Sequence, residues 1–146
     1  MIKNELRKDE CPLNRAVEAL GDTWSLLILR EIMLGSNRFS DLHEKLFIAK
    51  NILSQRLKHL VARKIISAKI DKNDARVIHY SLTKKGQELF VVFLALRQWA
   101  EKWTMHPKDI KYKIVERKGL KPLPDIQIKN IAGEKMTIND VVMIGH

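Results

Sequence analysis

The chain has 146 residues, which is the usual size of one domain with at most a small appendage and excludes a large multidomain machine. Its 45% hydrophobic and 30% charged residues are typical of a globular protein that folds around a core. The 27 basic and 17 acidic residues give a net charge of +10, which favours a polyanionic partner such as nucleic acid.

The chain shows no pattern of a membrane or secreted protein. Its longest apolar stretch, Leu89 to Leu96, is far shorter than the roughly 20 residues of a membrane-spanning helix. Charged residues are spread through the first ten positions, which include no apolar signal segment. We therefore expect a cytoplasmic protein with no membrane partner. Cys11 is the single cysteine, so an internal disulfide and a cysteine-based zinc site are both excluded.

Helical periodicity predicts four helices in the first part of the chain. Asp22 and Ser40 are suited to cap the second and third helices, and Gly21 and Gly35 to end the first and second. The second helix is apolar on nearly every side, so we expect it at the centre of the core. Only three residues separate the third helix from the fourth, which indicates a helix-turn-helix. The predicted ranges are 12–20, 23–34, 41–46 and 50–64.

A β-hairpin and a long helix are predicted next. The segments 65–71 and 76–82 have strand-like patterns around a polar turn, and Thr83 can cap a helix that continues to Trp103. The first half of this helix is apolar all round, more than one monomer could cover, so a second copy is the simplest partner. The predicted dimer interface consists of Leu89, Phe93, Leu96, Trp99 and Trp103.

The fold class expected from this order is α+β, mainly helical: a winged helix-turn-helix domain over residues 1–103, used for DNA binding and dimerisation. Residues 104–146 have short alternating pieces interrupted by prolines and glycines, and we predict a small, mostly β C-terminal appendage of unknown role. From Lys45 to Ile70 the chain has seven basic residues and no Asp or Glu. This local charge favours a docked DNA backbone; the alternative is a winged-helix protein-interaction module without specific DNA readout.

The fourth helix is the candidate recognition helix for the major groove. At 100° per residue, Leu53, Leu57 and Leu60 face inward, and a polar set faces outward. Asn and Gln side chains can pair with an adenine edge, and Lys suits a guanine edge or a phosphate. Arg56 lies nearer the inner boundary, where it can instead form a structural salt bridge. The outward set is Asn51, Gln55, Lys58 and His59, with Ser54 flanking it.

Backbone contacts to DNA are predicted at two further places. Arg38 and the first turn after Ser40 are placed to bind a phosphate at a helix start. Lys72 and Arg76 flank the tip of the wing, near residues 71–77, and could follow the backbone or the minor groove. The alternative is a merely solvated polar face for each outward residue of the fourth helix, and a solvated hairpin tip for Lys72 and Arg76.

Five sequence blocks resemble the HxlR family of bacterial and archaeal transcriptional regulators. The resemblance covers about Cys11 to Trp103 and implies a MarR-like winged-helix homodimer that binds operator DNA and has no enzymatic activity. In this chain Ala49-Lys50 stands where a Ser-Pro pair often opens the recognition helix, which removes a capping side chain. The blocks are Cys11-Pro12-Leu13, Gly21 to Glu31, Arg38 to Leu42, Leu53 to Leu57 and Tyr80 to Gly86.

Cys11 precedes Pro12 at a helix start, and Arg7, Lys8 and Arg15 are close in sequence. A helix N-terminus and basic neighbours favour a thiolate, so Cys11 is a candidate redox sensor. Some members of the family that the chain resembles use the cysteine of this Cys-Pro motif to sense electrophiles or oxidants, which implies a possible oxidant or small-molecule effector. The alternative is a small buried side chain under the first helix.

No catalytic pattern is evident. The five histidines lack metal-ligand spacing, and the six glycines form no phosphate-binding loop. We therefore expect no enzyme, no metal site and no cofactor.

Overall fold

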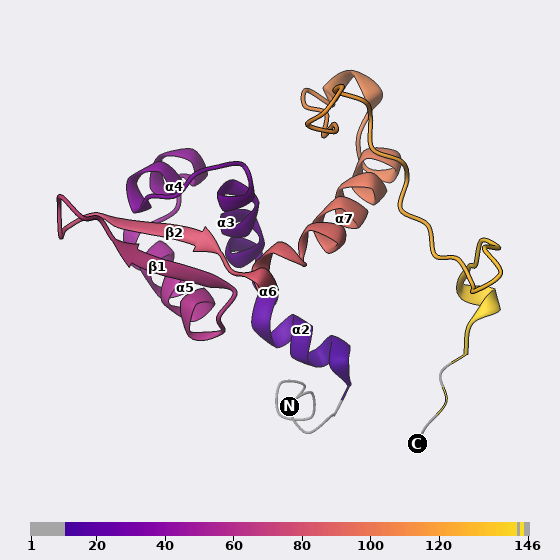
Figure 1. The fold of residues 1–146 in the computed structure, drawn as a ribbon, viewed down its shortest axis with the longest axis horizontal. Helices are drawn as coiled ribbons and strands as arrows, with labels where there is room; N and C mark the ends of the chain where they lie inside the picture. The colour runs from indigo at the N-terminus through magenta and orange to yellow at the C-terminus, as the bar shows by residue number, and fades with distance from the viewer. Residues whose placement is uncertain (1–10, 143, 145–146) are drawn as a thin grey trace. The chain divides into compact units, whose positions relative to one another are not determined.

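The structure is a computed structural model that describes residues 11–142 and residue 144. The chain divides into two compact units, one ending at Leu89 and one beginning at Phe90 (Figure 1). The assignment of DNA binding and dimerisation to residues 1–103 stays a prediction.

From Cys11 onward, where the structure describes the chain, four α-helices precede the hairpin, as the periodicity predicted. They are α2 (Pro12–Leu20), α3 (Thr23–Met33), α4 (Phe39–Leu46) and α5 (Lys50–Ala62). Pro12 occupies the first turn of α2, where its missing N–H costs nothing. The carboxylate of Asp22 caps α3 by accepting a hydrogen bond of 2.8 Å from the Ser25 backbone N–H, which confirms the predicted cap.

The core of the first unit consists of aliphatic side chains from α3, α4, α5 and the strand that begins at Ile66, and from the connections just before α5 and just before that strand. Ile28 and Leu29 of α3 are fully buried, so this helix lies at the centre as predicted. Each such side chain contributes about 1.5–3 kcal/mol through burial. The other core residues are Ile32, Leu42, Leu46, Ile48, Leu53, Leu57, Leu60, Ile65 and Ile66.

The helices α4 and α5 form the helix-turn-helix. Phe47 ends α4 in the left-handed conformation with a φ of 51°, and its N–H donates to the His43 carbonyl. The predicted start of α4 was wrong: Arg38, not Ser40, is the N-cap residue, and Ser40 lies inside the first turn. The helix starts earlier because the Leu42 N–H already bonds to the Arg38 carbonyl, four residues before it, at 3.1 Å.

The wing is an antiparallel hairpin of β1 (Ile66–Ile70) and β2 (Ile78–Leu82), in which Ile66 pairs with Leu82 and Ile70 with Ile78. Arg38 forms an isolated antiparallel bridge with His79, so the segment before α4 lies along β2. This pairing brings the start of the helix-turn-helix to the wing.

The predicted closing helix is interrupted. It consists of α6 (Lys84–Gln87) and α7 (Phe90–Trp103), separated by Glu88 and Leu89. The Thr83 hydroxyl accepts from the Gly86 N–H at 3.2 Å, which confirms this cap. Gly86 packs so closely on the Ile65 carbonyl that a Cβ would lie 2.2 Å from its oxygen. Gly within a helix lowers its stability by about 1 kcal/mol, and α6 ends one residue after Gly86.

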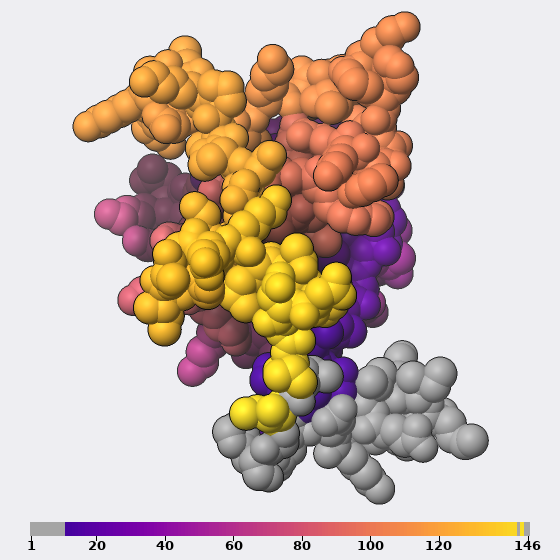
Figure 2. Space-filling view, turned by 90° about the vertical axis from the view of Figure 1, so that its right-hand side faces the viewer, coloured from indigo at the N-terminus to yellow at the C-terminus, as the bar shows by residue number. Residues whose placement is uncertain are grey.

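The second unit continues from α7 through two short 3-10 helices, η1 (Pro107–Asp109) and η2 (Ile138–Asp140). The segment is less regular than the mostly β appendage we predicted: between residues 104 and 142 its β structure is limited to the isolated bridges Val115–Pro122 and Lys129–Lys135. Its alternating pieces are too short, and too interrupted by turns, to pair as strands. In the space-filling view these residues, orange to yellow, form separate small lobes (Figure 2).

Gln98 of α7 holds the following segment by two hydrogen bonds. Its side-chain amide donates to the Pro124 carbonyl at 3.0 Å and accepts from the Ile126 N–H at 2.8 Å.

Within residues 11–142 and 144, the helices are all too short or too polar to cross a membrane.

Candidate nucleic-acid interface

The exposed face of α5 presents the side chains that the helical period predicted. Asn51, Gln55 and Lys58 are exposed, whereas Leu53 and Leu57 on the opposite side are fully buried. We call Asn51, Gln55 and Lys58 the readout face. Ser54 is half-buried at its flank. Leu53, Leu57 and Leu60 hold α5 to the core, so the amides of Asn51 and Gln55 and the ammonium group of Lys58 face outward.

Two other polar residues of α5 have partners within the fold. Arg56 Nη1 lies 3.3 Å from the Asp22 carboxylate, so the structural salt bridge considered for Arg56 is present. The helical period placed His59 among the outward residues. In the structure His59 is half-buried, and its Nε2 lies 3.1 Å from the Ala19 carbonyl oxygen. This contact at the end of α2 gives His59 a role within the fold, and we do not place it on the readout face.

Arg38 and Ser40 are both exposed at the start of α4. Arg38 is the N-cap residue and Ser40 lies in the first turn, where backbone N–H groups of a helix have no intrahelical acceptor. Because Arg38 also pairs through its backbone with His79 of β2, the helix start and the wing are adjacent.

The wing loop contains an acid–base cluster that the sequence analysis did not single out. His79 Nε2 lies 2.8 Å from the Asp71 carboxylate, and this hydrogen bond, with backbone N–H groups of Asn73 and Asp74, lowers the pKa of Asp71 to about 2. Arg76 donates twice to Asp74, each bond 3.0 Å long, which lowers the pKa of the Asp74 carboxyl. Asp and basic residues alternate from 71 to 76, and this pattern could have indicated ion pairs within the wing loop.

Lys72 and Arg76, the predicted wing contacts, are both exposed. The Arg76 side chain is 90% exposed although it is paired with Asp74. Its guanidinium is therefore accessible. A phosphate would have to displace the Asp74 carboxylate, or share the guanidinium with it.

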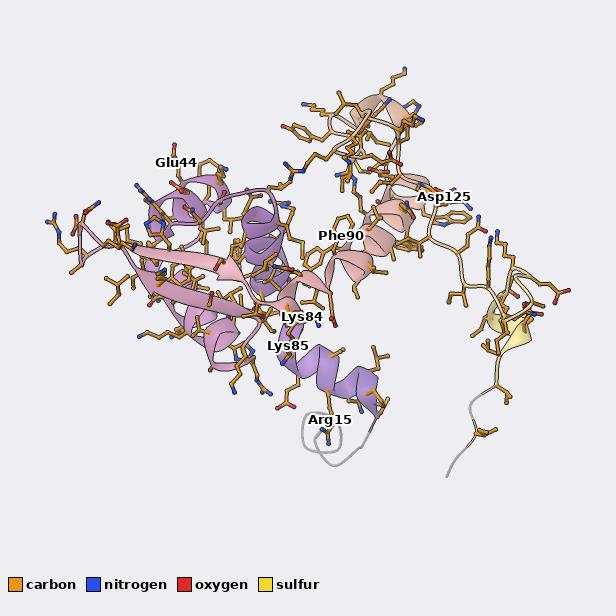
Figure 3. All side chains as sticks on the ribbon, viewed as in Figure 1. Arg15, Glu44, Lys84, Lys85, Phe90 and Asp125 are labelled. Atoms are coloured by element: carbon orange, nitrogen blue, oxygen red, sulfur yellow. The ribbon has the colours of Figure 1, made fainter. Side chains whose placement is uncertain are left out.

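Lys85 is a further basic residue that the sequence analysis missed. Its Nζ donates to the Arg63 backbone carbonyl at 2.8 Å, beyond the end of α5. Figure 3 shows Lys84 and Lys85 together at the start of α6. A cation at a helix C-terminus is favourable because the carbonyl ends of the helix are partially negative.

Four of the five residues predicted for dimerisation lie in α7, and Leu89 lies just before it, between α6 and α7. Leu89 is half-buried in the joint, and Phe93 is half-buried in α7. Leu96, Trp99 and Trp103 are 52%, 60% and 68% exposed. Phe90, Val91 and Val92 add to this exposed apolar surface, which is unusual for a helix that has no partner.

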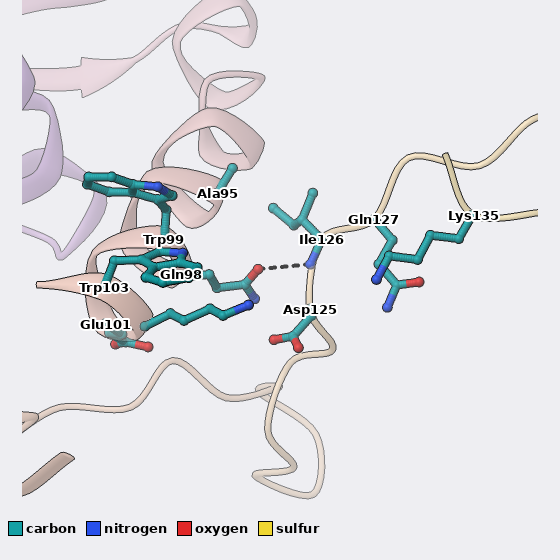
Figure 4. Close-up of a pocket in the computed structure, with 10 residues that line it drawn as sticks. Ala95, Gln98, Trp99, Glu101, Trp103, Asp125, Ile126, Gln127 and Lys135 are labelled. Atoms are coloured by element: carbon teal, nitrogen blue, oxygen red, sulfur yellow. Dashed lines mark hydrogen bonds between the residues drawn. The ribbon is translucent and has the colours of Figure 1, made fainter. Parts of the chain in front are cut away.

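An open pocket lies in the second unit between α7 and the segment that Gln98 holds (Figure 4). Trp99, Trp103 and Ile126 provide its apolar walls, and Glu101 and Asp125 add acidic groups. Lys102 and Lys135 also line it, so the pocket carries both acidic and basic groups.

Cys11 is the N-cap residue of α2 and is half-buried. Its carbonyl accepts from the N–H groups of Asn14 and Arg15 at 3.1 and 3.4 Å. Figure 3 labels Arg15 on α2, where it is exposed. The basic neighbours Arg7 and Lys8 lie outside the described residues. The structure thus contains the predicted helix start at Cys11.

A three-helix core with a helix-turn-helix and a hairpin wing defines a winged helix-turn-helix protein. The family model for the HxlR-like helix-turn-helix matches residues 19–108. The chain therefore belongs to this family of transcriptional regulators, which are not enzymes. This confirms the family that the sequence blocks indicated.

Two relatives similar in sequence are also named as helix-turn-helix-type transcriptional regulators. MT3179 of Mycobacterium tuberculosis, an uncharacterized helix-turn-helix-type transcriptional regulator, is 34% identical over 102 residues, which are 70% of this chain and 65% of MT3179. The match thus spans slightly less than two thirds of that relative's length. YodB of Bacillus subtilis, a helix-turn-helix-type transcriptional regulator, is 32% identical over 95 residues, which are 64% of this chain and 85% of YodB.

Solved structures show the same fold. PA1607, a candidate transcription factor, is 32% identical with a TM-score of 0.89, covering 96% of this chain and 98% of PA1607. Quinone-bound YodB has a TM-score of 0.55 at 34% identity, covering 64% of this chain and 99% of YodB. A MarR-family regulator from Porphyromonas gingivalis, 22% identical with a TM-score of 0.57 over 67% of this chain and 96% of its own, confirms the MarR-like fold alone.

Proposed function

We propose that this protein is a sequence-specific, double-stranded DNA-binding transcriptional regulator that acts as a homodimer. In this proposal α5 enters the major groove and the wing, residues 71–77, follows the backbone or the minor groove. The observation that carries the proposal is the readout face: three polar side chains exposed on a helix whose opposite side is anchored by fully buried leucines. Membership of a family of transcriptional regulators supports it.

Each exposed residue has a proposed task. Asn51 and Gln55 would each donate to and accept from an adenine edge, and Lys58 would reach a guanine edge or a phosphate. Ser54 can supply a shorter hydrogen bond at the flank. Phosphate contacts fix the register of the protein on the duplex and are assigned to Arg38, Ser40, Lys72 and Arg76.

Dimerisation is proposed through the exposed apolar surface of α7, with Leu89, Phe93, Leu96, Trp99 and Trp103 in the interface. A homodimer places two recognition helices on two half-sites about one helical turn apart, which explains why such regulators bind palindromic DNA. The cytoplasm is the location that a DNA-binding regulator of this kind requires, and it stays a prediction.

We further propose that an oxidant or electrophile acts through Cys11. The support is the position of Cys11 at the N-terminus of α2 and the similarity to YodB, which has been solved in quinone-bound and diamide-treated forms. The alternative is an effector that binds in the second unit, where Trp99 and Trp103 line an open pocket.

Selection from genomic DNA tests the proposed function. Full-length protein would be mixed with sheared genomic fragments at moderate salt, and the bound fragments sequenced. We expect enrichment of a common inverted repeat whose half-site centres are about 10–10.5 base pairs, or a multiple, apart. Absence of any enriched sequence from a folded preparation would instead favour a protein-interaction module.

A further inference from the structure

Three side chains on one stripe of α5 bond to the corner between α2 and α3. Arg56 Nη1 lies 3.3 Å from the Asp22 carboxylate, and His59 Nε2 lies 3.1 Å from the Ala19 carbonyl. Just beyond the helix end, Arg63 Nη2 lies 3.4 Å from the Glu18 carboxylate. Positions 56, 59 and 63 are three and four residues apart, so they share one side of the helix. We call these three contacts the corner ladder.

The Arg56 contact of the ladder reaches a carboxylate that is itself tied to the core. Asp22 accepts from the backbone N–H and the hydroxyl of Ser25 at 2.8 and 2.6 Å, and Ser25 is fully buried. The carboxylate that receives Arg56 is therefore held at the start of the central helix α3. At the other end, Glu18 and Ala19 belong to the last turn of α2.

The stripe lies roughly a quarter turn around α5 from the readout face, at 100° per residue. Burial of the leucines favours contact with the core but is not directional. Hydrogen bonds weaken steeply when their angles change. A small rotation of α5 about its axis would keep the leucines in the core, but it would disturb the ladder contacts and turn Asn51 and Gln55 away from the positions proposed for base contact.

We propose that Arg56, His59 and Arg63 are positioning residues that set the rotation of the recognition helix through the α2–α3 corner. Displacement of α2 would then redirect the readout face without any change at the DNA surface. This inference rests on the proposed function, because its effect is on DNA readout.

The first test compares binding to the selected operator with binding to random duplex of equal length. His59→Leu removes the hydrogen bond to α2, and we expect the ratio of the two affinities to fall about five- to tenfold, the size expected for one net hydrogen bond. Affinity for random duplex should stay within about twofold, because no phosphate contact is lost. His59→Gln retains a donor and should recover most of the ratio. A loss shared equally by both duplexes would make His59 a backbone contact and overturn its positioning role.

The Glu18–Arg63 contact can be tested by exchanging the two charges, and Lys64 provides a matched control. Arg63→Glu should lower the affinity ratio, and addition of Glu18→Arg should restore it. Lys64→Glu makes the same charge change at the neighbouring exposed position, and Glu18→Arg should give no such rescue there. Equal rescue of both variants would show that only net charge matters, which would contradict the ladder.

Amide hydrogen exchange on the full chain without DNA gives a second readout. Loss of the His59 bond should speed exchange in residues 12–20 of α2 relative to residues 39–46 of α4. Unchanged exchange in α2 would overturn the ladder as its anchor. Faster exchange with an unchanged affinity ratio would leave the contacts structural and reject positioning. Wild-type protein that binds no duplex would refute the proposed function, and this inference with it.

Discussion

At the scale of single residues, DNA readout is assigned to very few side chains, and Gln55 is the most informative of them. Its exposed amide lies in the middle of the readout face. Replacement by Ala should cost about 1–3 kcal/mol at the operator and much less on random duplex, because a base contact is lost while phosphate contacts stay. Fluorescence anisotropy titrations with both duplexes measure this difference.

Lys72→Ala is the matched control for Gln55→Ala, since the proposed contact of Lys72 is a phosphate. It should weaken both duplexes similarly and lower the slope of log affinity against log salt by about one. If Gln55→Ala behaves in this same way, Gln55 has a positioning role and reads no base.

The wing gives a pH-dependent prediction. The His79 hydrogen bond is the largest cause of the lowered pKa of Asp71, about 2 against an ordinary 3.8. Because the folded pKa is the lower one, ionised Asp71 stabilises the wing above pH 3.8, and this stabilisation is lost as the pH falls toward 2. NMR titration of the carboxyl carbon should give a midpoint near 2, and His79→Ala should move it upward. A midpoint that His79→Ala leaves unchanged would contradict this assignment.

The sequence predicted the outer face of α5 better than its sides. The period of 3.6 separates Asn51 and Gln55 from the buried Leu53 and Leu57, since burial of the leucines determines which side of the helix faces the core. It could not assign His59, because the partner of its ring is a backbone carbonyl forty positions earlier, at Ala19. Contacts of this kind depend on how helices cross, and no local pattern carries that information.

At the scale of elements, α2 connects the candidate sensor to the readout helix. Cys11 begins α2, and the last turn of α2 contacts α5. Modification of Cys11 should change the packing of α2, and operator affinity should fall after treatment with diamide or a quinone. Cys11→Ser should bind the operator like the wild type and should not respond to either reagent. Binding that is unchanged after complete modification of the wild type would leave Cys11 as a packing residue.

The secondary structure followed from local signals wherever a cap or a breaker was present. Asp22, Thr83 and Pro12 each lie where the sequence placed them. The break between α6 and α7 was missed because Glu88 and Leu89, where it lies, include no glycine or proline that would mark it. The segment after Trp103 was overestimated as β because alternation alone does not provide a neighbouring strand.

At the scale of the whole molecule, the apolar surface of α7 predicts a dimer. Phe93→Asp combined with Leu96→Asp places two charges in the proposed interface and should yield monomers or aggregates, because a buried unpaired carboxylate is costly. Sedimentation velocity at micromolar concentration measures the change. Gln87→Asp, on the exposed side of α6, is a control that should stay dimeric. A stable wild-type monomer at that concentration would refute dimerisation through α7.

Sequence-specific DNA binding is tested most directly by titrating the wild-type protein against its selected operator and a scrambled duplex over a range of salt concentrations. We predict an operator affinity at least about a thousandfold above that for the scrambled duplex. For both duplexes log affinity should fall linearly with log salt, because bound phosphates release counterions. A folded dimer that binds neither duplex at low salt, or both equally, would contradict a regulator that reads DNA sequence through α5.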